Sequence, residues 1–137
     1  MKIREIMTTN VECVPPDTAL QQLANKMKAL DVGFIPVCES DRLVGTVTDR
    51  DIVLRCIAEG KDIGTCKTRD IMSKDAFWCF QDQDVKDVAK KMREKDVRRM
   101  LILNQDKRLV GVVSIGDIAK VEEKETGKTL KDITEAA

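Results

Sequence analysis

Residues 43–51 read LVGTVTDRD, and residues 109–117 read LVGVVSIGD. Both stretches place a glycine in a run of aliphatic residues, followed by a hydroxyl residue and, three positions later, an aspartate. Runs rich in valine favour strands, and a hydroxyl residue three positions before an acid favours the start of a helix. Each stretch therefore predicts a strand that passes directly into a helix.

The sequence before these stretches is also repeated. Residues 4–7 read REIM, and residues 69–72, which lie 65 positions later, read RDIM. A period of this length that occurs twice fits two small subdomains packed on each other better than a solenoid, which needs about three or more units.

Each repeat is expected to have the element order β-α-β-β-α, which gives an α/β (α+β) fold. Leucine, alanine and methionine recur at spacings of three and four after Pro16, which predicts an amphipathic helix capped by Asp17 or Thr18. In repeat one, strands are expected at 11–14, 34–38 and 43–47, and helices at 20–30 and 49–59. In repeat two, strands are expected at 77–80, 100–103 and 109–113, with helices at 83–94 and from Ser114 onward.

These boundaries predict four segments: repeat one at 1–60, a linker at 61–68, repeat two at 69–120 and a charged, helical C-terminal extension at 121–137. Each half has roughly 65 residues, which is marginal for an independent hydrophobic core. We therefore expect the two repeats to fold together.

The composition excludes several function classes. The 137 residues include 24 basic and 24 acidic ones, so the net charge is zero and offers no basic footprint for nucleic acid or an anionic membrane. The five cysteines form no CxxC pair and histidine is absent, so no metal site is expected. Reduced thiols, together with the lack of a long apolar run or signal-peptide core, predict a cytoplasmic protein.

The candidate ligand-binding residues lie in the two strand-to-helix turns. Thr48 and Asp51, and likewise Ser114 and Asp117, place a hydroxyl and a carboxylate on the first turn of a helix, where free N–H groups also point outward. That combination can hold a sugar diol and a phosphate. The same pattern is a capping box, and the two roles are compatible.

The order of elements, the IM pairs at 6–7 and 71–72, the GFIPV sequence at 33–37 and the two turns together resemble a tandem CBS-domain pair, or Bateman module. The resemblance covers about residues 1–120. It implies that the repeats pack through their sheets about a pseudo-twofold axis, leaving two clefts that often bind AMP, ATP, NAD or S-adenosylmethionine. It also implies a homodimer, because stand-alone prokaryotic members commonly form a flat disk.

By this resemblance, each cleft takes the turn of one repeat and the opening segment and second-strand start of the other. The first cleft would contain Thr48, Arg50, Asp51, Ser73, Lys74, Arg98, Arg99 and Met100; the second would contain Thr8, Asn10, Gly33, Phe34, Ile35, Pro36, Ser114, Ile115 and Asp117. Guanidinium groups bind phosphate oxygens in a bidentate manner, so a polyphosphate is expected to prefer the first cleft.

The resemblance implies a non-catalytic regulatory module that binds an adenosine-containing ligand and signals to an effector protein in trans. AMP, ADP and ATP are the leading ligands, with NAD and S-adenosylmethionine as further candidates. The alternative is a constitutive dimerisation scaffold with vestigial clefts. An enzyme is not expected, because the sequence has no histidine or P-loop and no obvious nucleophile beside Asp51 or Asp117.

Overall fold

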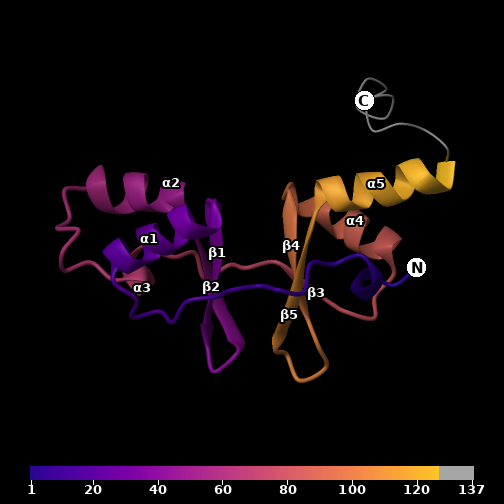
Figure 1. The fold of residues 1–137 in the computed structure, drawn as a ribbon, viewed down its shortest axis with the longest axis horizontal. Coiled ribbons are helices and arrows are strands. Elements are labelled where there is room, and N and C mark those ends of the chain that lie inside the picture. The colour runs from indigo at the N-terminus through magenta and orange to yellow at the C-terminus, as the bar shows by residue number, and fades with distance from the viewer. Residues whose placement is uncertain (127–137) are drawn as a thin grey trace. The chain divides into compact units, whose positions relative to one another are not determined.

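The computed structural model describes residues 1–126, which form two compact units (Figure 1). Residues 12–76 make one unit, named here the β1–β2 unit. Residues 1–11 and the chain from Phe77 onward make the other, the β3–β5 unit.

The β1–β2 unit is built on an antiparallel hairpin that is covered by helices. Its elements are α1 (Leu20–Leu30), β1 (Phe34–Glu39), β2 (Arg42–Thr48), α2 (Asp49–Asp51), the π-helical segment η2 (Ile52–Ile57) and α3 (Thr68–Ile71). Ser40 and Asp41 both have positive φ angles, 50° and 67°, in the tight turn between the strands.

The β3–β5 unit has the same plan with a third strand. Its elements are the 3-10 turn η1 (Ile3–Glu5), β3 (Trp78–Phe80), α4 (Val85–Lys95), β4 (Arg99–Leu103), β5 (Leu109–Ser114) and α5 (Ile115–Thr126). Strand β3 pairs with β4 in parallel, and β4 pairs with β5 in antiparallel orientation. The mixed architecture confirms the expected α+β class.

The first strand and the first helix cap expected for repeat one were wrong. The strand at 11–14 is reduced to one parallel bridge between Val14 and Val37, because Pro15 and Pro16 follow directly and cannot donate to a ladder. The cap of α1 is Ala19, without a side-chain hydrogen bond, since the Thr18 hydroxyl donates instead to the Pro15 carbonyl at 2.8 Å. In repeat two, by contrast, Asp84 caps α4 by accepting from the Lys86 amide at 2.9 Å.

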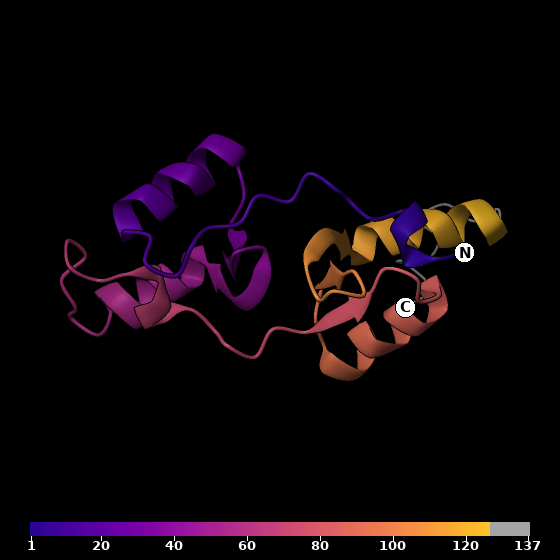
Figure 2. The same cartoon turned by 90° about the horizontal axis from the view of Figure 1, so that it is seen from below.

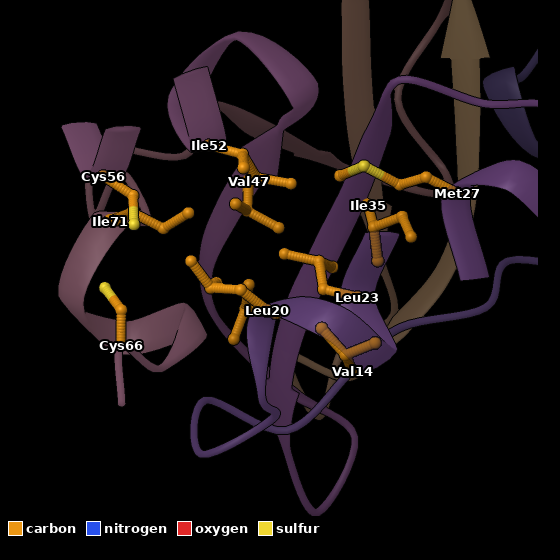
Figure 3. Packing of buried hydrophobic residues seen from close by; sticks show 11 residues of the cluster. Val14, Leu20, Leu23, Met27, Ile35, Val47, Ile52, Cys56, Cys66 and Ile71 are labelled. Carbon is orange, nitrogen blue, oxygen red and sulfur yellow. The ribbon is translucent and has the colours of Figure 1, made fainter. Parts of the chain in front are cut away.

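The apolar stripe of α1 is buried against the hairpin, as Figure 3 shows. Leu20 and Leu23 are fully buried beside Val47. Complete burial of each such side chain stabilises the fold by about 1.5–3 kcal/mol. An equivalent cluster in the β3–β5 unit is formed around Val88 and Met92 of α4. In residues 1–126, no helix is both long enough and apolar enough to cross a lipid bilayer.

Each unit is completed by the opening segment of the other sequence repeat. In the β3–β5 unit, the Ile3 amide donates to the Gln83 carbonyl at 2.8 Å, and Ile3 is fully buried. In the β1–β2 unit, the Thr68 amide donates to the Thr18 carbonyl at 2.9 Å, and Thr68 is fully buried. Figure 2 shows the indigo N-terminal segment reaching the unit that contains α4 and α5. The compact units therefore differ from the segments 1–60 and 69–120 that the sequence suggests.

The C-terminal extension is helical as far as the structure describes it. Helix α5 continues beyond residue 120 to Thr126. The rest of the expected extension, 127–137, lies outside the described residues.

Candidate functional site

The Thr48 turn is a complete capping box at the end of β2. The Thr48 amide donates to Oδ2 of Asp51 at 2.9 Å, and the Asp51 amide donates to Oγ1 of Thr48 at 3.1 Å. The Asp51 side chain is 18% exposed. The cap uses only Oδ2 of the carboxylate, and Oδ1 lies 3.6 Å from Nε of Arg55.

The Ser114 turn has the same geometry at the end of β5. The Ser114 amide donates to Oδ2 of Asp117 at 2.9 Å, and the Asp117 amide donates to Oγ of Ser114 at 3.1 Å. Among the described residues, Oδ1 of Asp117 has neither a hydrogen bond nor an ion pair. Both turns therefore use the capping role that the sequence left open, and neither turn uses both oxygens of its carboxylate in the cap.

The start of the preceding strand lies beside each turn. The Asp49 amide donates to the Gly33 carbonyl at 3.0 Å, and the Ile115 amide donates to the Arg98 carbonyl at 2.9 Å. The strand register pairs Phe34 with Thr48 and, in the other unit, Arg99 with Ser114.

The register also shows which strand start lies beside each turn within a unit. Gly33 and Phe34 lie beside the Thr48 turn, and Arg98 and Arg99 beside the Ser114 turn, because the first strand of an antiparallel hairpin begins where the second one ends. The expected grouping of Arg98 and Arg99 with the Thr48 turn, and of Gly33 and Phe34 with the Ser114 turn, joins residues of different units and stays a prediction.

The opening segment of the other repeat bonds to the strand that leads to each turn. In the β1–β2 unit, Thr46 and Ser73 exchange two backbone hydrogen bonds of 2.9 and 2.8 Å. In the β3–β5 unit, Thr8 and Val112 do the same at 2.9 and 3.0 Å. Each turn therefore begins two residues after a backbone bridge that joins both sequence repeats.

Two residue groups result, and we name each by its hydroxyl residue. The Thr48 site comprises Gly33, Phe34, Thr48, Asp49, Arg50, Asp51 and Ser73. The Ser114 site comprises Thr8, Arg98, Arg99, Ser114, Ile115 and Asp117. They differ in charge, since Gly33 and Asp49 stand where the other site has Arg98 and Ile115.

Other expected site residues lie farther from the turns or in the cores. Ile35 and Met100 are 1% and 0% exposed and belong to the two hydrophobic clusters, and Pro36 is also buried. Asn10 and Lys74 are exposed, each next to or near a bridging segment. The buried side chains contribute packing behind the sites.

Arg55 was missed by the sequence analysis. Its Nε lies 3.6 Å from Oδ1 of Asp51, and its Nη1 donates to the carbonyls of Ile71 and Met72 at 3.3 Å each. Arg55 therefore links the Thr48 turn to the segment that leads to Ser73. The acid–base spacing of four residues on a helix was the available signal, although that spacing is common on exposed helix faces.

Two surface hollows lie in the β1–β2 unit. One of about 320 Å³ is lined by Asp49, Arg50, Val53 and Leu54, and therefore borders the Thr48 site. The other, of about 480 Å³, is lined mainly by the Pro15–Asp17 segment, the end of β1 and Arg69. No set of three or more potential metal-ligating side chains converges within residues 1–126.

The element order and the paired turns agree with a direct family match. The CBS domain profile matches residues 3–57 and again residues 69–124. The chain belongs to the CBS domain family. The CBS domain-containing protein YhcV of Bacillus subtilis is 35% identical over 134 residues, which cover 96% of this chain and 94% of that protein. Hypoxic response protein 1 of Mycobacterium tuberculosis is 34% identical over 118 residues, which cover 85% of this chain and 82% of that protein.

Solved CBS structures have the same fold. A crystal structure of Hypoxic Response Protein I with two coordinated zinc ions gives a TM-score of 0.80 at 33% identity, covering 88% of this chain and 98% of that one. CBSX2 in complex with AMP gives 0.77 at 21% identity, covering 91% and 98%. The CBS domain pair of protein MJ0100, in complex with 5′-methylthioadenosine and S-adenosyl-L-methionine, gives 0.76 at 20% identity, also covering 91% and 98%.

Proposed function

We propose that this CBS pair is a non-catalytic regulatory module that binds an adenosine-containing ligand and signals to an effector protein in trans. The observation that supports this most directly is the presence of two equivalent hydroxyl–carboxylate turns, each beside a bridging segment of the other repeat. The AMP complex of CBSX2 and the S-adenosylmethionine complex of the MJ0100 pair support the ligand class.

The ribose is assigned to the carboxylates of the two turns. The cap occupies Oδ2 of Asp117, so Oδ1 can accept hydrogen bonds from a vicinal diol. Oδ1 of Asp51 is available on the same terms once its contact with Arg55 rearranges, since an ion pair at 3.6 Å with a half-exposed arginine is weak.

A phosphate group is assigned to the Ser114 site. Arg98 and Arg99 are exposed at the start of β4, and the Arg98 backbone is bonded to Ile115, the first residue of α5. The corresponding place in the Thr48 site holds Gly33 beside the Asp49 carboxylate, which would repel an anion. A polyphosphate should therefore prefer the Ser114 site, the reverse of the preference expected from the sequence.

The ligand would act by linking the two sequence repeats. Each site draws its turn from one repeat and its bridging residue, Thr8 or Ser73, from the other. A ligand that binds one arrangement of these segments better than another shifts the population between them. An effector that recognises the favoured arrangement would then read the ligand concentration.

The deciding experiment is a thermal-shift and calorimetry panel of AMP, ADP, ATP, NAD and S-adenosylmethionine. At 100 times its dissociation constant, a ligand should add roughly 2.7 kcal/mol to the free energy of unfolding. Arg98→Ala should weaken a phosphate-bearing ligand by about tenfold or more, because a charge-assisted contact is lost while the Ser114 cap stays intact. Arg50→Ala, which removes an exposed arginine at the Thr48 site, is the matched control.

The alternative function is a constitutive dimerisation scaffold, and one observation favours it. Val53, Leu54 and Ile57 of η2 are 52%, 44% and 58% exposed, and together form an apolar face suited to a second copy of the chain. A stable dimer that gains no stability from any member of the ligand panel would support the scaffold over the sensor.

A further inference from the structure

Two cysteine thiols face each other in the core of the β1–β2 unit. Cys56 lies in η2 and Cys66 lies two residues before α3, and both belong to the same buried cluster. Figure 3 shows the two sulfur atoms directed toward one another.

The backbone around the pair holds the two cysteines close together. The Lys61 amide donates to the Cys56 carbonyl at 3.0 Å, and the Cys66 amide donates to the Asp62 carbonyl at 3.0 Å. The thiols also point at nearby carbonyls, with Sγ of Cys56 3.7 Å from the Lys61 oxygen and Sγ of Cys66 3.9 Å from the Lys67 oxygen. These local bonds fold the connection between η2 and α3 back on itself.

The segment that connects the two cysteines lies at the surface. Residues 58–65 are all exposed, whereas Cys56 and Cys66 are 0% and 6% exposed. Gly60 has a φ of +73° and Gly64 follows nearby, so the segment contains two residues whose backbone can adopt a wide range of conformations. A segment that is tied mainly by local backbone bonds can open without unfolding the whole unit.

We propose that Cys56 and Cys66 form a reversible disulfide that acts as a redox-dependent staple in the β1–β2 unit. The oxidant is a low-molecular-weight disulfide. One cysteine thiolate attacks a reagent sulfur, forming a mixed disulfide and releasing one reagent thiol. The second cysteine thiolate then attacks the protein sulfur of the mixed disulfide and releases the second reagent thiol. Both cysteine protons end on the released thiols, so the pair loses two electrons and the reagent gains them.

Burial controls the rate of this reaction. Desolvation, and next the neighbouring Cys56 thiol, raise the pKa of Cys66 above its usual value. Since only the thiolate attacks a disulfide, exchange should be slow at neutral pH and accelerate as pH rises. The nearby charges have opposite effects on this pKa, because the Asp70 carboxylate raises it and the Lys61 ammonium lowers it.

The staple would restrain the segment that leads to the Thr48 site. Cys66 stands just before α3, and α3 is followed by Met72 and Ser73, which contacts Thr46. Arg55, in the same helical segment as Cys56, bonds to the Met72 carbonyl. A covalent link between the ends of this connection would therefore reduce the freedom of both partners of the bridge.

The test uses a full-length variant that carries Cys13→Ala, Cys38→Ala and Cys79→Ala, so that only the proposed pair remains. The reagent is bis(2-hydroxyethyl) disulfide, applied without denaturant at about pH 8.5, near the ordinary thiol pKa. We expect the mass to fall by two hydrogen atoms, a peptide linking residues 56 and 66 after digestion, and a Tm higher by about 5 °C. Dithiothreitol should reverse all three changes.

Two controls test whether the two cysteines pair with each other in the folded protein. Cys66→Ala added to this variant should give only a mixed disulfide at Cys56 and no rise in Tm. Oxidation of the wild type should also produce the 56–66 linkage, which guards against a folding defect in the triple variant. The proposal is overturned if the reagent yields only mixed disulfides, or if the linkage forms solely after urea is added.

Discussion

Gly45 and Gly111 occupy equivalent strand positions where a crossing backbone segment comes close. A Cβ atom on Gly45 would lie 2.6 Å from the Ser73 carbonyl oxygen. On Gly111 the nearest atom would be Sδ of Met7, at 2.5 Å, followed by its Cγ and the Thr8 carbonyl oxygen at 3.1 Å. The first obstacle is backbone, whereas the nearest atoms at Gly111 belong to a flexible side chain.

We therefore predict that Gly45→Ala lowers the free energy of unfolding by about 1–3 kcal/mol, and Gly111→Ala by less. Gly116→Ala is the control, because its Cβ would meet nothing closer than 3.6 Å and it lies in the first turn of α5. That control should be neutral or slightly stabilising. Chemical denaturation measures all three, and equal effects at Gly45 and Gly116 would contradict the steric argument.

We expect the stability of α4 to depend on pH, because the carboxyl of its cap residue Asp84 has a lowered pKa. Its hydrogen bond from the Lys86 amide, and next the nearby N-terminal ammonium group, lower the pKa of this carboxyl. A folded-state pKa below the unfolded value means that its contribution is present above the unfolded pKa and is lost as pH falls through the folded pKa.

The Tm difference between wild type and Asp84→Ala should therefore be larger at neutral pH than in strong acid. Asp84→Asn is the matched control, since asparagine also caps helices but does not titrate. Thermal unfolding monitored by circular dichroism over a pH series measures the effect. A difference that stays constant down to strong acid would rule out the charge as its source.

The helix that follows β2 differs from the one that the sequence predicts. The sequence predicts one helix over 49–59, whereas the structure has a short α-helical turn followed by the π-helical segment η2. The Ala58 amide donates to the Val53 carbonyl at 2.8 Å, a spacing of five residues. This widened turn buries Ile52 and Cys56 and leaves Val53, Leu54 and Ile57 exposed.

If the exposed face of η2 mediates dimerisation, Ile57→Glu should shift the protein from dimer to monomer. The substitution should leave Tm of the monomer nearly unchanged, because Ile57 is 58% exposed and belongs to neither hydrophobic cluster. Sedimentation equilibrium of wild type and variant measures the change. Ile63→Glu, at a residue that is 46% exposed outside η2, is the control and should leave the mass unaltered.

At the scale of the whole molecule, the chain exchanges its two opening segments between the units. Ile71 is fully buried in the cluster around Leu20 and Val47, although it belongs to the second sequence repeat. A unit cut at the repeat boundary therefore lacks part of its own core.

A fragment of residues 12–76 should unfold more cooperatively than a fragment of equal length, 1–65, that follows the sequence repeat. The shorter core of 1–65 loses Ile71 and the buried Thr68 hydroxyl, which donates to the Thr18 carbonyl at 2.8 Å. Thermal melts and amide exchange of the two fragments measure the difference. Fragments with indistinguishable cooperativity would show that the exchanged segment contributes little.

Much of the fold follows from local patterns in the sequence. The helix stripe ending at Leu30, the hairpin around Ser40 and Asp41, and both capping turns were all predictable, because spacing and turn chemistry act between near neighbours. The strand at 11–14 was not, since pairing next to Pro15 and Pro16 depends on which donors remain. The π-helical turns of η2 were also not predictable, because they depend on which side chains the core accepts.

By itself, the sequence determined the twofold repeat, the family, and the residues of the Thr48 and Ser114 turns. Only the tertiary structure decided which segments meet at those turns: Gly33 and Ser73 at one, Arg98 and Thr8 at the other. The physical reason is that a capping box forms within four consecutive residues, whereas strand pairing joins residues far apart in sequence. The register of the paired strands is fixed by burial of the whole sheet face. It also depends on the close approach of the Ser73 and Thr8 backbone that Gly45 and Gly111 permit.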